Sequence, residues 1–459
     1  MKKQIRALIA GVILLVALGG LWLFLAQNPQ PEEAAEETRY VAGNVQADQI
    51  KAITIQQGQA SFRLAADAEG AFTLENWGDI PLNNDLLGQS RTAAAAIPVK
   101  LVVSEEGGDL SKYGLQNPPV RVVLSVEGQT DVTLNIGNEA PANEGVYVSV
   151  EGQSPVYLVA ANSLSFANRA PTDYVSLVAS AVEDPTNPPA FSAAVLSGEE
   201  REATVEVSTQ LDESGTSTFF MTAPVRYKIS STAINLLQSA TSITAEGVAA
   251  VRPSETQLET LGLKEPYATL TLSLEDGTSV VVKASRPAES GALYFMLEGR
   301  PVIYMGSTEL LSWVQMPYSS LLSTIPVSMP LTELDSIQVT IPQKQWSFAV
   351  TGEGDALKAT LDGKEVDADQ FRRLYQGIHS ASFGEHTDLR PEGEPVMTFA
   401  YKAKDGRTRE VRFYEGPVRK LFITAGDLEP QFFTGTTYMD QILANLERIA
   451  AGEAVQAVN

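Results

Sequence analysis

The two histidines of this chain, His379 and His386, are the side chains best suited to metal binding or proton transfer. They lie seven residues apart, and Glu385 adjoins the second. A helical zinc site needs its ligands one turn apart, and Gly384 interrupts the predicted helix before the second histidine. A serine triad could form only near these histidines, and no nucleophile elbow occurs. We therefore expect no metal, no cofactor and no catalytic residue.

Carboxylates and tryptophans offer two further kinds of chemistry. One acidic cluster has oxygen ligands for calcium but lacks the spacing of an EF-hand loop. Its members are Asp362, Glu365, Asp367 and Asp369. Paired carboxylates can hydrolyse glycosidic bonds, and tryptophan rings can stack on sugars. We interpret Trp77, Trp313 and Trp346 as core residues and keep a cell-envelope carbohydrate binder or hydrolase as the alternative function.

The composition excludes several other classes of site. The chain has 459 residues and no cysteine, which rules out disulfides, thiolate metal sites and a cysteine nucleophile. Neither a P-loop nor a dinucleotide-binding glycine pattern is present, so nucleotide binding has no support. A formal net charge of −23 disfavours nucleic acid as a partner.

The N-terminus is predicted to cross a membrane. Residues 7–26 carry no charge, and a helix of that length spans roughly 30 Å of hydrocarbon. Lys2, Lys3 and Arg6 precede this segment, so the positive-inside rule places the N-terminus in the cytoplasm and the bulk of the chain outside the cell membrane. We interpret residues 1–26 as a single-pass signal anchor, with a cleavable signal peptide as the alternative.

A repeated phrase is the most informative pattern in the exported part. Gly114 and Gly262 each lie between hydrophobic residues, and a proline and an alternating strand follow. Two tyrosines come after each strand at one spacing, and a divergent third copy has Phe422 and Phe432 instead. The repeated residues are Tyr113, Gly114, Leu115, Pro118, Tyr147 and Tyr157, then Gly262, Leu263, Pro266, Tyr294 and Tyr304, then Pro395. We interpret the glycines as positive-φ positions that end a helical turn and the tyrosines as packing residues.

These patterns divide the chain into consecutive segments. An acidic, flexible tether and three tandem repeats follow the anchor, with a proline-rich linker between the first two repeats. The predicted ranges are 27–44 for the tether, 45–180 for repeat 1, 181–192 for the linker, 193–327 for repeat 2, 328–450 for divergent repeat 3 and 451–459 for a tail.

Each repeat is predicted to be an antiparallel sheet or meander covered by one main helix, which is an α+β class. Asn83 or Asn84 begins the first of these helices, and Pro98 marks its end. In repeat 2 the opening strand is placed at residues 203–207. In repeat 3, Asp367 and Gln370 are predicted to form a capping pair.

The repeated phrase also carries a family resemblance. Residues 110–118, Leu-x-x-Tyr-Gly-Leu-x-x-Pro, together with the Val-Tyr-Leu strand at 156–158, resemble the bacterial domain of unknown function 4340 family. Residues 258–266 with Tyr304 are similar to a second copy. The resemblance implies a membrane-anchored or exported protein, and some members are encoded beside ABC-type transporters of the gliding-motility kind. It implies no catalytic residues.

We therefore expect a non-catalytic, extracytoplasmic accessory or scaffold protein. Its N-terminal helix would hold it in the membrane, and its partner would be a membrane-protein complex such as an ABC-type transporter. A structural spacer between such components is a further alternative. The sequence does not indicate an oligomeric state.

Overall fold

The computed structural model describes residues 38–459 apart from a few short gaps. The gaps are 44, 181, 183, 185, 212–216, 328, 386, 388, 426–431 and 459. The predicted anchor at residues 7–26 and the histidine at position 386 lie outside the described residues. Within the described part of the chain, no helix is long and apolar enough to cross a membrane. The chain divides into two compact units between Val175 and Ser176.

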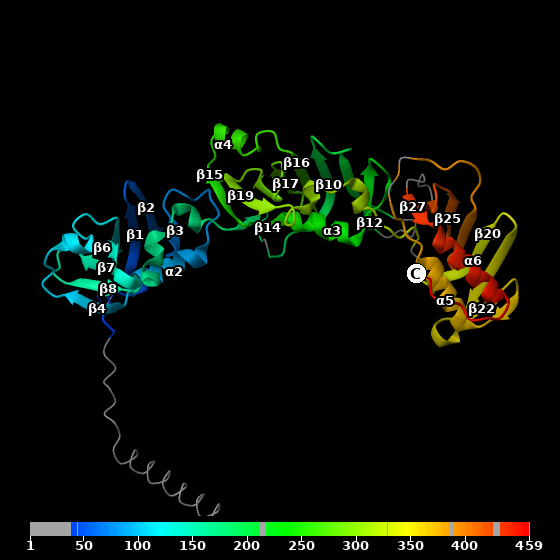
Figure 1. Ribbon diagram of the computed structural model, residues 1–459, viewed down its shortest axis with the longest axis horizontal. Helices are drawn as coiled ribbons and strands as arrows, with labels where there is room; N and C mark the ends of the chain where they lie inside the picture. The colour runs from blue at the N-terminus through cyan, green and yellow to red at the C-terminus, as the bar shows by residue number, and fades with distance from the viewer. Residues whose placement is uncertain are drawn as a thin grey trace, which may run out of the picture. The chain divides into compact units, whose positions relative to one another are not determined.

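Antiparallel sheets make up most of the structure, and helices are few, as the sequence predicted (Figure 1). Sheet 1 has eight strands and lies in the first unit, whereas sheet 2, with nine strands, and sheet 3, with eight, lie in the second. The strands of sheet 1 are β1 (Ile50–Gln57), β2 (Ala60–Ala66), β3 (Phe72–Leu74), β4 (Val99–Ser104), β5 (Val120–Val126), β6 (Val132–Glu139), β7 (Val146–Val150) and β8 (Val156–Val159).

Sheet 2 and a separate two-stranded sheet begin the second unit. Sheet 2 contains β10 (Phe191–Gly198), β11 (Val205–Leu211), β12 (Ser217–Ala223), β13 (Tyr227–Lys228), β15 (Gly247–Val251), β16 (Ala268–Leu274), β17 (Ser279–Ala284), β18 (Ala292–Leu297) and β19 (Val302–Ser307), and β9 (Val178–Ser180) pairs with β14 (Ser242–Thr244). Sheet 3 contains β20 (Leu334–Ile341), β21 (Lys344–Thr351), β22 (Lys358–Leu361), β23 (Lys364–Val366), β24 (Met397–Ala403), β25 (Thr408–Glu415), β26 (Lys420–Ala425) and β27 (Phe432–Gly435).

The helices are short and are joined by several 3-10 turns. The α-helices are α2 (Asn84–Ala95), α3 (Ser231–Gln238), α4 (Glu255–Thr260), α5 (Ala368–His379) and α6 (Thr436–Ala450). The 3-10 helices are η1 (Ala47–Gln49), η2 (Leu110–Tyr113), η3 (Pro141–Asn143), η4 (Ala161–Asn168), η5 (Pro171–Tyr174), η6 (Ser239–Thr241), η7 (Ser312–Val314), η8 (Tyr318–Leu321) and η9 (Gly354–Ala356).

One strand order runs through all three sheets. Sheet 1 is ordered β3-β2-β1-β5-β6-β7-β8-β4, and sheet 2 follows the same path from β12 to β15 with β13 added outside β12. Sheet 3 follows it from β22 to β27, with β23 added at the corresponding edge. Helices α2, α3 and α5 have equivalent places in the chain. Each follows the strand at the first edge of its sheet, which is β3, β13 or β23.

A β-bulge recurs at one register position. It lies where the first strand of each sheet pairs with the strand that follows the repeated phrase. The shift falls between Ile50 and Ala52 in β1, between Phe191 and Ala193 in β10, and between Leu334 and Ser336 in β20. A bulge adds one residue to its strand and so breaks the two-residue alternation of faces. For that reason Ile50 and Ile53, an odd number of positions apart, are both fully buried in one core.

The bulge also explains a strand that sequence reasoning missed. Strand β10 starts at Phe191, inside the stretch interpreted as a linker, whereas the opening strand had been placed at residues 203–207. Only Phe191, Ala194 and Leu196 of β10 are buried, and the bulge interrupts their alternation. Alanine and serine, which fill much of this strand, give little β signal.

The main helices start at side-chain caps. Asn83 Oδ1 accepts the N–H of Leu86 at 3.0 Å, so α2 begins where the sequence predicted. Asp367 Oδ1 likewise caps α5 by accepting the N–H of Gln370 at 3.0 Å. The predicted pair is not reciprocal, however, because the Gln370 side chain accepts the N–H of Val455 instead, at 2.7 Å.

The chain is also hydrogen-bonded to each sheet at the point where it arrives. We call these arriving residues the lead-in segments: 39–41 for sheet 1, 177–180 for sheet 2 and Thr324 for sheet 3. Each lead-in segment pairs with the stretch after the main helix of the sheet that it enters. The equivalent N–H···O bonds are Val99 to Arg39 at 2.8 Å, Ala245 to Leu177 at 2.7 Å and Phe383 to Thr324 at 2.7 Å.

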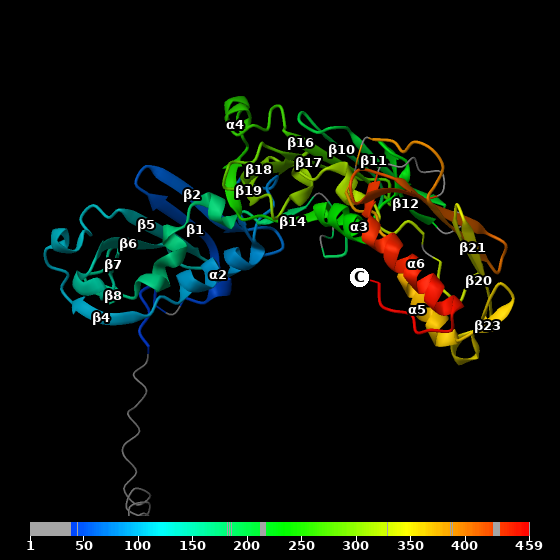
Figure 2. The same ribbon diagram turned by 45° about the vertical axis from the view of Figure 1, so that its right-hand side comes forward.

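Sheet 3 differs at its last edge. Sheets 1 and 2 have β4 and β15 there. In the part of sheet 3 that the structure describes, this edge has a short stretch in which Gly384 N–H donates to Phe433 O and Phe433 N–H donates to Glu385 O, both at 2.8 Å. Helix α6 is an addition that lies beside α5, as Figures 1 and 2 show from two directions.

The lead-in segment of sheet 1 is expected to stabilise the first unit. Val41 is buried, and its N–H donates to Ile97 O at 2.9 Å. A chain shortened to begin at Gly43 should lose about 2 kcal/mol or more of unfolding free energy relative to a chain that begins at Arg39. Urea unfolding of the two shortened chains measures the difference, and identical midpoints would contradict the prediction.

Candidate functional site

The first copy of the repeated phrase forms a joint on the far face of sheet 1, opposite α2. Gly114 follows η2 with φ +69°, and the N–H of Leu115 donates to Leu110 O at 3.0 Å. Leu115 is buried yet lies outside the large core that contains α2. The rings of Tyr113 and Tyr147 meet beside it, with their centroids 4.9 Å apart. The phrase thus covers part of a sheet face and presents no reactive group.

The second copy builds the same joint on sheet 2. Ser254 caps α4, and its own N–H donates to Gln257 Oε1 at 2.9 Å, so the cap is reciprocal. Gly262 also has φ +69°, and Leu263 N–H donates to Leu258 O at 2.8 Å. The joint residues form a small separate core. Its members are Ala250, Leu263 and Ile303, with Leu258, Leu261, Tyr294 and Met296 packed against it.

The second tyrosine of each copy packs on the helix side of its sheet. Tyr157 is buried, and its hydroxyl accepts a hydrogen bond from Arg39 Nη2 at 2.9 Å. Tyr304 is buried against Phe295, with ring centroids 5.4 Å apart, and burial raises its pKa to about 12. Both tyrosines are therefore packing residues.

The third copy has residues at positions equivalent to those of the first two copies. Pro395 precedes β24 just as Pro118 and Pro266 precede β5 and β16. Phe422 lies opposite Phe433 in the register that Tyr147 and Leu158 have in sheet 1. These two phenylalanine rings contact each other, with centroids 4.7 Å apart.

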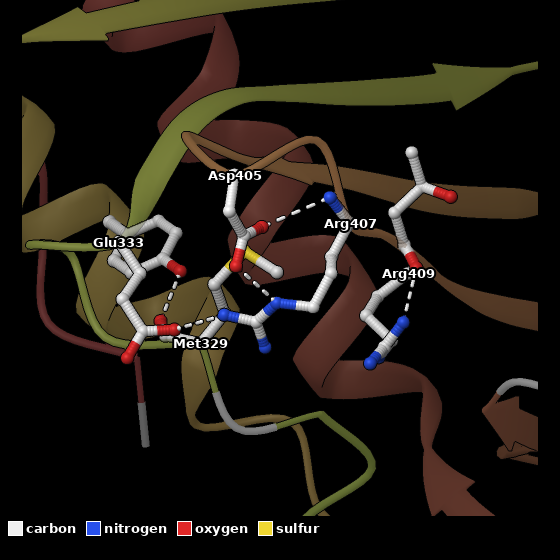
Figure 3. A network of polar contacts seen from close by, with 7 residues as sticks. Met329, Glu333, Asp405, Arg407 and Arg409 are labelled. Atoms are coloured by element: carbon white, nitrogen blue, oxygen red, sulfur yellow. Dashed lines mark hydrogen bonds and ion pairs between the residues drawn. The ribbon is translucent and has the colours of Figure 1, made fainter. Parts of the chain in front are cut away.

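Two carboxylates come together across Arg407 at the turn between β24 and β25 (Figure 3). Arg407 lies between them, with its Nε 2.6 Å from Asp405 Oδ2 and its Nη2 2.9 Å from Glu333 Oε2. The backbone N–H and the side chain of Arg407 both donate to Asp405 and lower its pKa. A glycosidase acid needs a raised pKa and open space between its carboxylates. This arrangement therefore argues against hydrolysis here and fixes the turn instead.

Several of the other residues with possible chemistry have structural roles. Asp362 accepts the N–H of Ser347 at 3.1 Å, and Asp369 pairs with Arg372 at 2.5 Å. Trp313 and Trp346 are almost fully buried and offer no platform to a sugar. Among the described residues, no group of three or more His, Asp or Glu side chains is placed to hold a metal ion.

Two pockets open on the second unit. One, of about 200 Å³, is lined in part by Arg201, whose Nη1 donates to Trp313 O at 3.0 Å and whose Nη2 donates to Met316 O at 2.5 Å. These bonds engage the two terminal nitrogens of Arg201 and hold the end of η7, whereas its buried Nε has no hydrogen-bond partner among the described residues. The other pocket, of about 400 Å³, lies between the β22–β23 hairpin and the end of α6.

Comparison with known families agrees with this architecture. The family model described as Domain of unknown function (DUF4340) matches residues 73–177 and 220–394. These regions cover more than half of the chain, and the chain therefore belongs to this family. Two matched regions are consistent with tandem copies of the domain. The second begins later than the predicted repeat 2 at 193–327 and continues into sheet 3, where it ends in the loop after α5 and before β24. No curated protein and no solved structure matches the chain.

Alanine at the two joint glycines should destabilise the protein unequally. Both glycines have positive φ, which costs about 1 kcal/mol for a residue with a side chain. An added Cβ at Gly114 would also lie 2.6 Å from Asn138 Cγ, whereas at Gly262 the nearest atom is Ser285 Cβ at 3.4 Å. We expect Gly114→Ala to lower the unfolding free energy more than Gly262→Ala does. Gly128→Ala, at φ +71° in open space, controls for the backbone cost alone. Equal effects of Gly114→Ala and Gly128→Ala would contradict the role of Asn138.

His379 should make stability depend on pH. Its ring lies 5.9 Å from that of Tyr375, and burial lowers its pKa below the usual 6.5. The unfolded chain therefore binds the proton more readily, and protonation favours unfolding as the pH falls below about 6.5. Urea unfolding at pH 7.5 and 5.5 should show a smaller acid loss in His379→Gln than in the natural protein. His386→Gln is the matched control, and an unchanged acid loss in His379→Gln would refute this role.

Proposed function

We propose that this protein is a membrane-anchored accessory or scaffold protein whose three sheets lie outside the cytoplasm and bind a membrane-protein complex, such as an ABC-type transporter. The observation that supports this proposal is that the repeated residues serve packing. The joints cover part of the far faces of two sheets, and the second tyrosine of each copy, Tyr157 or Tyr304, is buried. A repeated architecture without a repeated reactive group suits binding better than catalysis.

The N-terminal sequence supports the membrane location. Residues 7–26 are uncharged and long enough to span a bilayer as a helix, and basic residues precede them. The lead-in segment 39–41 lies inside the stretch predicted as a flexible tether, yet Arg39 and Val41 are hydrogen-bonded to sheet 1. In this proposal a mechanical force on the N-terminal segment acts directly on a folded sheet, which also fits the spacer alternative.

Exposed aliphatic side chains at one recurring cross-strand pair are the first surface to test for the partner. Leu101 on edge strand β4 is 57% exposed and lies opposite Leu158 on β8. At the equivalent pair of sheet 2 the exposed side chain is on the other strand, since Met305 on β19 is 40% exposed and lies opposite Gly247 on edge strand β15. Single exposed aliphatic side chains are common, so the support comes from their recurrence at the same cross-strand pair.

Crosslinking in membranes tests the proposal directly. After mild crosslinking at native expression, purification of the full chain should recover a membrane-protein complex. Leu101→Asp and Met305→Asp should each reduce that recovery, because a buried carboxylate is costly in an apolar contact. Leu211→Asp, at a leucine that is 71% exposed elsewhere, is the matched control.

Three outcomes distinguish the alternatives. Recovery of no membrane partner would count against the accessory role. Equal recovery with all three variants would place the contact on another surface. A spacer would tolerate every surface substitution and fail only when a whole sheet is removed.

A further inference from the structure

The last residues of the chain lie against α5 and α6 and are held there by specific bonds. Figure 2 shows this segment, residues 453–458, turning back after α6. Asn445 on α6 binds the backbone of Gln456 twice: its Nδ2 donates to Gln456 O at 2.9 Å, and its Oδ1 accepts the Gln456 N–H at 2.8 Å. Gln370 on α5 accepts the N–H of Val455 at 2.7 Å. We call the space between the two helices that receives this segment the α5–α6 groove.

These hydrogen bonds are made to backbone atoms, so they do not depend on which side chains the bound peptide carries. Asn445 is only 2% exposed, so its amide would lose both partners if the segment left and nothing replaced it. An amide that offers one donor and one acceptor matches the N–H and C=O of a single residue. The groove is therefore built to hold a polypeptide.

Two valines of the segment supply the side-chain contacts through which the groove would discriminate between peptide sequences. Val455 is buried, and Val458 is half-buried, whereas the residues on either side of Val455 are exposed. Burial at a spacing of three residues matches the repeat of a polyproline II segment, whose backbone groups remain free to bind a receptor. The groove thus favours aliphatic residues three positions apart.

A glycine inside α5 makes room for this contact. A Cβ added to Gly377 would lie 2.7 Å from Val458 Cγ2 and 3.5 Å from Ile442 Cδ1. Glycine is unfavourable in a helix interior compared with alanine. The close approach of Val458 gives a physical reason for glycine at this position.

The groove also continues beyond the residues that fill it. The pocket of about 400 Å³ described above adjoins Gln370 and Glu453, and its wall includes Leu361, Val366 and Ile449. The C-terminal segment leaves this space open. A different peptide could place a larger side chain there.

We propose that the α5–α6 groove is a peptide-binding site that the C-terminal segment of the chain fills in cis. Its ligand class is a peptide with aliphatic side chains three residues apart. The segment is held by three backbone-directed hydrogen bonds and two small side chains. Ordering a short segment costs conformational entropy that opposes these gains, so a peptide that makes the same contacts can compete with the segment for the site. The inference does not depend on the proposed membrane partner.

The test uses the chain ended at Gly452 and a fluorescent synthetic peptide of residues 453–459. Fluorescence anisotropy should show saturable binding to the shortened chain and much weaker binding to the intact chain, whose groove is filled. Asn445→Ala in the shortened chain should weaken binding at least tenfold, and a peptide carrying Val455→Asp should not bind. Glu447→Gln, which removes only the exposed pair with Lys344, should leave binding unchanged. A shortened chain that melts cooperatively and binds no peptide would overturn the proposal.

A second measurement keeps the proposal testable if the shortened chain does not fold. In the intact chain, Gly377→Ala should push Val458 out and speed hydrogen exchange at the amides of Val455 and Gln456. Amides in the interior of α6 should keep their protection. Unchanged exchange in the segment would overturn the inference.

Discussion

The pairing of the first strand of each sheet with the strand after the repeated phrase is the constraint on which the rest of the structure depends. In sheet 1 this pairing sets Ile53 opposite Leu124, and both are fully buried. The chain between them contributes two strands, a helix, an edge strand and the joint. Closing so long a loop costs entropy, which the burial along the central pair must offset. This strand pairing places α2 on one face of the sheet and the joint on the other.

The two faces of the sheets consequently carry different amounts of core. The helix face of sheet 1 holds a large buried cluster that includes Leu87 and Ala94 of α2. Among the residues that the structure describes, the far face of sheet 2 holds a small cluster around Leu263. Charged groups elsewhere pair at the surface, as Lys283 does with Glu298 at 2.9 Å, and such exposed pairs contribute little to stability. The buried clusters of the described residues thus consist of side chains that pack the sheets against their helices and joints.

Features set by a few neighbouring residues were predictable. Caps depend on a side chain reaching amides within one turn, so Asn83 and Asp367 could be identified as caps before the structure was known. The glycines at 114 and 262 were likewise predictable, because positive φ after a helical turn is a local demand. Strand β10 was not, since a bulge and several alanines removed the alternation that marks a strand.

Contacts between segments that are distant in the sequence could not be predicted from local patterns. Gln370 has the spacing of a capping partner, yet its side chain accepts the N–H of Val455, which lies far along the chain. The lead-in bonds and the grip of Asn445 on Gln456 also join segments that no local pattern relates. The sequence by itself determined the antiparallel α+β class, the repeats, the caps and the glycine joints, because each depends on short-range periodicity or on one backbone conformation. Only the tertiary structure decided the shared bulge, the lead-in bonds and the α5–α6 groove, because backbone groups on distant segments can satisfy one another only after the sheets have closed.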